Sequence, residues 1–113
     1  RILADVLVKH AAPLGPQPLE DAVADAVERG LADGVIVTGT ATGAAAMPED
    51  VRRAAAATAA PVYVGSGISA ENAGQYVPPA AGVIVGSWLK ADGIVANPVD
   101  AARVRALRER LAG

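Results

Sequence analysis

The segment Gly34–Gly39, which reads Gly-Val-Ile-Val-Thr-Gly, decides how the rest of the chain is interpreted. It is a short, continuous run of β-branched residues without apolar–polar alternation, which is typical of a parallel sheet covered on both faces. Three more apolar runs, rich in Val and Ile, share this character: Ile2–Lys9, Pro61–Val64 and Gly82–Val85. We therefore expect four parallel strands.

A helical pattern follows each of these runs. We expect helices over about 18–29 and 48–57, a third that begins at Ser69 and extends to Val77, and a fourth that follows Asp100. Ser69 and Asp100 are typical N-cap residues. The apolar residues of the fourth helix recur at helical spacing and form one stripe: Val104, Leu107 and Leu111. The order is therefore βαβαβαβα, with corresponding segments about 20 to 32 residues apart, the size of a βα repeat.

Two architectures fit this order. An open doubly wound sheet would need a Gly-rich dinucleotide loop after its first strand, and residues 10–15 lack that pattern. A barrel instead places polar residues at the carboxyl end of every strand. Such residues follow all four runs: Lys9-His10, Thr38–Thr40, Gly65–Gly67 and Gly86-Ser87. We favour an α/β fold of the (β/α)8 TIM-barrel type, with the open sheet as the alternative.

The extent of the chain suggests part of a barrel. Four βα units correspond to the second half of the fold, and residues 1–113 are expected to form a single partial barrel domain. The first strand begins without a Met or a preceding turn, so we expect a fragment of a longer barrel. Four strands cannot close a barrel, and the two outer strands would keep unpaired edges. We therefore predict a homo-oligomer or a partner that supplies a complementary half-barrel.

Composition removes several classes of function. The formal net charge is −2 and no basic block occurs, so nucleic acid is not an expected partner. The chain has no Cys and 1 His, which excludes thiolate and multi-His metal sites within one chain, and we expect no metal and no cofactor. No apolar run approaches the roughly 18 residues of a membrane span. Without a signal-peptide pattern at residues 1–6, we expect a cytoplasmic protein.

The clearest functional signal is a pair of glycine- and serine-containing strand ends. Glycines let the backbone approach an anion, and exposed N–H groups before a helix favour negative charge. Barrel enzymes frequently bind phosphate with the loops after strands seven and eight, which these loops would be. We predict that five residues bind the phosphate of a small ligand: Gly65, Ser66, Gly67, Gly86 and Ser87. The alternative is that they only form tight βα turns.

Catalytic candidates lie at the first strand. Strand alternation puts Asp5 and Lys9 on one face, opposite the all-apolar face that should contact the helices, so both should point into the barrel. They are roughly 13 Å apart along a strand and do not pair directly. Lys9 could bind a phosphate or act as an amine nucleophile, and His10 could be a general acid or base. The alternatives are an ion pair for Lys9 and an incidental loop position for His10.

Several stretches together carry a family resemblance. They are Ala4–Ala11, Gly34–Gly43, Val64–Ile68 with Glu71-Asn72, and Gly82–Lys90 followed by Asp92-Gly93 and Asn97–Asp100. In these stretches the chain resembles the C-terminal half of the BtpA (BtpA/SgcQ) family. The resemblance implies a ribulose-phosphate-binding type of barrel. It also implies kinship with photosystem I biogenesis factors, although members occur widely where no photosystem exists, and it supplies no substrate.

Two classes of function remain open. The first is an enzyme that acts on a small phosphorylated metabolite, such as an isomerase or lyase, with Lys9 positioning or activating the substrate. The second is a non-catalytic photosystem I biogenesis or assembly factor, or a truncated half-barrel without activity. A carboxylate base near Lys9 in the complementary half would favour the enzyme.

Overall fold

The computed structural model of the chain describes residues 1–7, 14–39 and 44–112. Its strands are β1 (Leu3–Asp5), β2 (Gly34–Thr38), β3 (Val62–Gly65) and β4 (Gly82–Ile84). Its main helices are α1 (Leu19–Ala24), α2 (Pro48–Ala57) and α3 (Ala101–Ala112), and a π-helical segment, η1 (Asp25–Arg29), continues α1. Three short 3-10 turns complete the set: η2 (Ala73–Gln75), η3 (Ser87–Leu89) and η4 (Ala91–Gly93).

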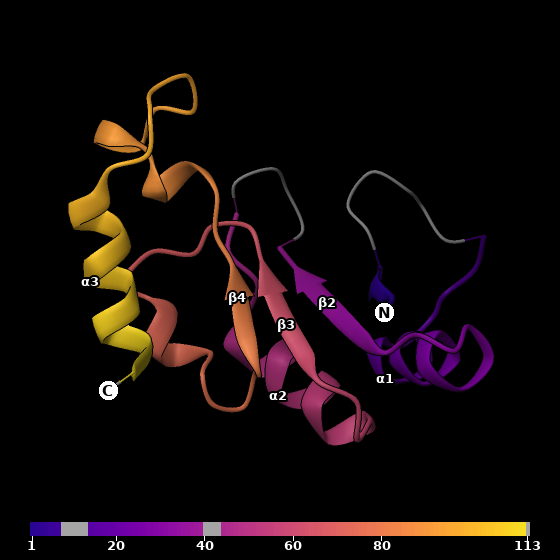
Figure 1. The fold of residues 1–113 in the computed structure, drawn as a ribbon. Helices are drawn as coiled ribbons and strands as arrows, with labels where there is room; N and C mark the ends of the chain where they lie inside the picture. The colour runs from indigo at the N-terminus through magenta and orange to yellow at the C-terminus, as the bar shows by residue number, and fades with distance from the viewer. Residues whose placement is uncertain (8–13, 40–43, 113) are drawn as a thin grey trace.

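The four strands form one parallel sheet in the order β1-β2-β3-β4 (Figure 1). Strands that follow one another in sequence are therefore neighbours throughout. A doubly wound sheet reverses its strand order at a switch point, and this sheet does not. The sequential parallel order confirms the predicted α/β fold and is consistent with half of a barrel. It also brings the carboxyl ends of all four strands to one edge.

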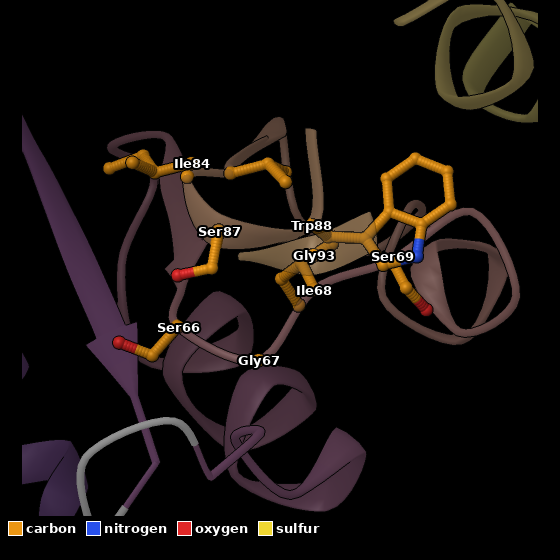
Figure 2. A pocket seen from close by; sticks show the side chains of 10 residues that line it. Ser66, Gly67, Ile68, Ser69, Ile84, Ser87, Trp88 and Gly93 are labelled. Atoms are coloured by element: carbon orange, nitrogen blue, oxygen red, sulfur yellow. The ribbon is translucent and has the colours of Figure 1, made fainter. Parts of the chain in front are cut away.

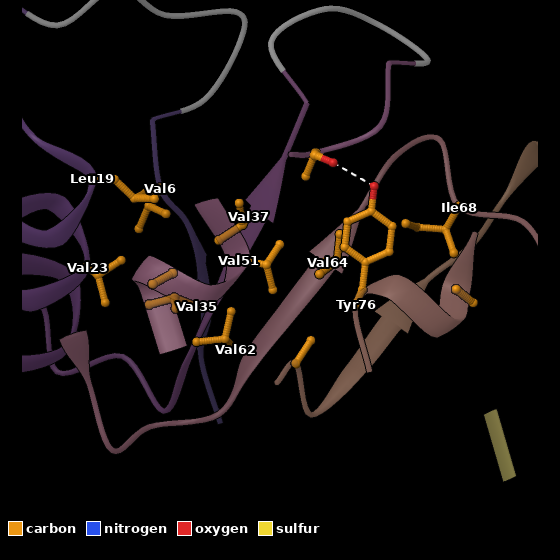
Figure 3. Close-up of a cluster of buried hydrophobic side chains, with 14 of the residues drawn as sticks. Val6, Leu19, Val23, Val35, Val37, Val51, Val62, Val64, Ile68 and Tyr76 are labelled. Atoms are coloured by element: carbon orange, nitrogen blue, oxygen red, sulfur yellow. Dashed lines mark hydrogen bonds between the residues drawn. The ribbon is translucent and has the colours of Figure 1, made fainter. Parts of the chain in front are cut away.

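Valine side chains form the core between the sheet and the helices (Figure 3). On the sheet, this face consists of Val35 and Val37 from β2 and Val62 and Val64 from β3, all at most 3% exposed. Val23 of α1 and Val51 of α2 have no exposed surface and belong to the same cluster. Small side chains let helices lie close to a sheet, so the Ala- and Val-rich composition suits this layer.

The opposite face of the sheet keeps large side chains in contact with solvent. Leu3 is 46% exposed and Ile84 is 48% exposed. Asp5 is also exposed, whereas Val6, the next residue, is buried in the core cluster. Asp5 therefore lies on the solvent-exposed side of the strand end. In a closed barrel this face would be the interior.

The third predicted helix is wrong in length. Ser69 does cap a turn, because the Asn72 N–H donates to Ser69 Oγ (3.3 Å) and the Ser69 N–H donates to Asn72 Oδ1 (2.9 Å). Beyond it, however, only η2 forms. Gly74 weakens a helix, and Pro78-Pro79 removes the backbone donors that a longer one would need.

Two other elements differ from expectation. β1 ends at Asp5, short of the predicted strand over residues 2–9, of which residues 8 and 9 lie outside the described part of the chain. In α3, Asp100 caps the helix as predicted, since the Ala102 N–H donates to its Oδ1 (2.8 Å). Of the predicted apolar stripe, Leu107 is buried and Leu111 packs partly buried against the core, whereas Val104 is 40% exposed.

Candidate functional site

A pocket of about 600 Å³ lies between the loops that follow β3 and β4 (Figure 2). Its lining comes from three segments: Ser66–Ser69, Ile84–Trp88 and Gly93. Gly65 pairs with Ile84 in neighbouring parallel strands, so the two loops leave the sheet side by side. Four of the five predicted phosphate-binding residues thus line one pocket, and the fifth, Gly65, is buried at the end of β3.

The chain leaves β3 through two left-handed residues. Ser66 and Gly67 both have φ 67°. Glycine adopts this conformation freely, whereas for serine it costs roughly 1 to 2 kcal/mol. A Cβ on Gly67 would also lie 2.6 Å from the Ala45 backbone nitrogen. The fold itself therefore requires a glycine at position 67, while Ser66 is the kind of backbone outlier that clusters at functional sites.

Gly86 is different from Gly67. Its φ is −119°, and a Cβ built there meets no atom within 4 Å. Packing within the described chain thus does not explain the absence of a side chain at this position. A glycine in a pocket wall leaves room for close approach of a ligand to the backbone.

The pocket offers hydrogen-bond donors but no charge. Within the described part of the chain, the N–H groups of Gly67, Gly86 and Ser87 make no backbone hydrogen bond. The hydroxyls of Ser66 and Ser87 lie on the same side of the pocket (Figure 2). The described residues that line it include no charged side chain. An anion bound here would be held by backbone N–H groups and hydroxyls.

An arginine from the last helix fixes one wall of the pocket. Arg103 Nη1 donates to the Trp88 carbonyl oxygen (2.8 Å), and its guanidinium carbon lies 5.2 Å from the centroid of the Trp88 ring, within cation–π range. The pKa of Glu71 is lowered by its own backbone N–H, by the Ser69 hydroxyl and by the charge of Arg103. Arg103 thus connects α3 to the loop after β4 by direct contact and to the loop after β3 by its charge.

Comparison with known proteins identifies the family. The chain matches the BtpA family over residues 1–113. It belongs to the BtpA family. It is 51% identical over 112 residues to the photosystem I biogenesis protein BtpA of Synechocystis, covering 98% of this chain and 39% of that protein.

Other BtpA relatives come from distant organisms. The chain is 48% identical over 105 residues to an uncharacterized protein of Pyrococcus furiosus, covering 93% of this chain and 39% of the relative. An uncharacterized mitochondrial protein of Caenorhabditis elegans is 47% identical over 73 residues, which are 65% of this chain and 26% of that protein. No solved structure matches the chain. The chain thus spans well under half the length of these BtpA relatives.

Of the three predicted catalytic residues, the structure describes Asp5 alone. Asp5 lies exposed at the end of β1. Lys9 and His10 fall outside the described residues, so their roles stay predictions. Across the residues that the structure does describe, no group of three His, Cys, Asp or Glu side chains could hold a metal ion. None of the described helices has the length and apolar character needed to cross a membrane.

A second cavity, of about 230 Å³, lies near the ends of β1 and β2 of the BtpA chain. Asp50 and Arg53 line it, and they form an ion pair with each other at 3.2 Å. Arg53 also pairs with Glu20 of α1 at 2.6 Å, which lowers the pKa of the Glu20 carboxyl by hydrogen bonding. These charges join α1 to α2, so we assign them a structural role.

Sequence reasoning missed the apolar wall of the site. Ile68 and Trp88 line the pocket together with the predicted glycines and serines. Each lies one residue beyond a predicted phosphate-binding residue, and this position along the chain is the signal that could have found them.

Proposed function

We propose that this chain supplies the phosphate-binding part of a BtpA-family barrel and holds a small phosphorylated metabolite between the loops after β3 and β4. The observation that supports the proposal is the single pocket lined by Ser66, Gly67, Gly86 and Ser87. Loops after the last two strands are the usual phosphate site of barrel enzymes. The exposed N–H groups there match the acceptor oxygens of a phosphate.

The positive charge would come from the first strand of the chain. Lys9 follows β1, whose carboxyl end lies at the same sheet edge as those of β3 and β4. In the enzyme hypothesis, Lys9 positions or activates the substrate of an isomerase or lyase, and His10 and Asp5 are the remaining acid–base candidates. We also propose that the protein is cytoplasmic.

A second candidate function is a non-catalytic role in photosystem I biogenesis. The observation in its favour is the 51% identity to the Synechocystis protein of that name. In both proposed functions the pocket binds a ligand, but only the enzyme would convert it into a product. Conversion of a bound phosphorylated compound, lost in Lys9→Met, would support the enzyme. Binding without conversion would support the assembly factor.

Titration of the protein with inorganic phosphate tests the site directly. Ser87→Ala should weaken binding several-fold, because loss of one hydroxyl hydrogen bond removes about 1 kcal/mol. Lys90→Ala is the control, since Lys90 does not line the pocket and its variant should bind as the parent does. Calorimetry would measure both after circular dichroism has confirmed folding. Equal affinity of the parent and Ser87→Ala for inorganic phosphate would show that the Ser87 hydroxyl does not contact the phosphate.

We also propose that residues 1–113 form a single partial barrel domain that requires a complementary half, either a second copy or the rest of a BtpA-family barrel. The supporting observation is an open sheet with β1 and β4 at its edges and large apolar side chains exposed on one face. A domain of this size buries only about two thirds of its unfolded surface, so a partner has much to add.

The chain should therefore associate in solution. Light scattering at micromolar concentration should give a mass above that of the 11.2 kDa chain. Leu3→Lys places a charge on the exposed sheet face and should shift the equilibrium toward the monomer. Leu14→Lys changes a fully exposed side chain in the loop before α1 and should have no such effect. A stable parent monomer would count against the proposal.

A further inference from the structure

We infer that the ligand of this pocket is the phosphate ester of an apolar group, aromatic or branched, and not a polyhydroxylated sugar phosphate; the inference rests on the proposed phosphate site. The inference is based on the different chemistry of the two sides of the pocket. The Ser66 and Ser87 hydroxyls lie toward one side, and the Trp88 ring lies on the other (Figure 2). A phosphate at the hydroxyl side would direct its ester group along the remaining wall.

That wall is apolar in the part of the chain that the structure describes. The apolar side chains that line the pocket are Ile68, Ile84, Val85 and Trp88. Among the residues that line the pocket, the polar side chain on the Trp88 side is Ser69, whose oxygen already accepts the Asn72 N–H (3.3 Å). Sugar hydroxyls placed against these residues would lose their hydrogen bonds to water and would gain no side-chain hydrogen bonds in return, which is unfavourable. An apolar ester group gains from the same burial.

The size and rigidity of the wall agree with this ligand class. A pocket of about 600 Å³ is far larger than one phosphate needs and lies within the usual range for organic ligands. Arg103 holds Trp88 by its hydrogen bond to the carbonyl oxygen and by its position over the ring. A fixed aromatic side chain loses little conformational freedom when a flat or branched group packs against it.

The experiment compares three probes by calorimetry: inorganic phosphate, phenyl phosphate and ribose 5-phosphate. We expect phenyl phosphate to bind at least about tenfold more tightly than ribose 5-phosphate, because apolar pockets discriminate against added hydroxyls by factors up to about a hundred. Ile84→Thr should reduce this preference several-fold. Ile84 is 48% exposed, so the variant should fold normally.

Variants of the aromatic wall provide a second arm. Trp88→Ala should also reduce the preference for phenyl phosphate, and Trp88→Phe should retain most of it. Equal or tighter binding of ribose 5-phosphate, with inorganic phosphate still bound, would overturn the ligand class and leave the phosphate site standing. Failure of all three probes to bind the folded protein would overturn both. A preference for phenyl phosphate that neither Ile84→Thr nor Trp88→Ala reduces would overturn the assignment of this wall.

Discussion

Gly86→Val is expected to abolish phosphate binding, a loss of at least a hundredfold in affinity, while the protein remains folded. Gly86 lines the pocket, and its backbone N–H is one of the donors that a phosphate would use. The branched carbons of valine would occupy the space through which the anion must approach. Losing several charge-assisted hydrogen bonds at once exceeds the effect of any single hydroxyl. Calorimetric titration with inorganic phosphate measures the loss.

The folded state of this variant can be anticipated from its surroundings. A Cβ at Gly86 meets no atom within 4 Å, so a side chain at this position collides with no described residue. Gly15→Val is the matched control, because Gly15 also has open space around its Cβ but lies outside the pocket. Gly67→Val is unsuitable, since its Cβ would collide with the Ala45 backbone and unfold the loop. Unchanged phosphate affinity in folded Gly86→Val would leave these glycines as turn formers.

The parts of the fold that were predictable have strong local signals. The expected segments 34–38 and 48–57 coincide with β2 and α2. A continuous β-branched run that ends in Thr-Gly and a helix that opens with Pro-Glu-Asp are each specified by a few neighbouring residues. The segment after Ser69 carries a similar start signal, but it forms only a short turn. There the capping residues act over one turn, and Gly74 prevents the helix from continuing.

The candidate site was predictable only in its polar half. Gly-Ser pairs directly after apolar strands indicate an anion site, because backbone and hydroxyl donors are recognisable in sequence. Ile68 and Trp88 are not recognisable from the sequence as pocket residues, since an apolar residue that lines a pocket has the same sequence pattern as one that fills the core. The left-handed φ of Ser66 could not be predicted from the sequence either, because residues with a Cβ rarely adopt this conformation. Whether these residues line the pocket depends on where the neighbouring helices and strands place them.

Leu107→Ala is expected to destabilise the protein by about 2 to 5 kcal/mol, the range measured for truncation of buried leucines. Leu107 is 7% exposed and is the one buried side chain of α3. The helix packs against η2 and η3, the segments that follow β3 and β4, so the cavity left by alanine would form beside the pocket loops. Denaturant unfolding followed by circular dichroism measures the change in unfolding free energy.

Val104→Ala is the control that separates docking of α3 from its helix propensity. Val104 is on the same helix but 40% exposed, so its truncation should change the unfolding free energy by only about half a kcal/mol. Because Arg103 reaches Trp88 from α3, partial undocking in Leu107→Ala should also shift the fluorescence of the single tryptophan before global unfolding. A loss of stability no larger in Leu107→Ala than in Val104→Ala would show that α3 is not docked through this leucine.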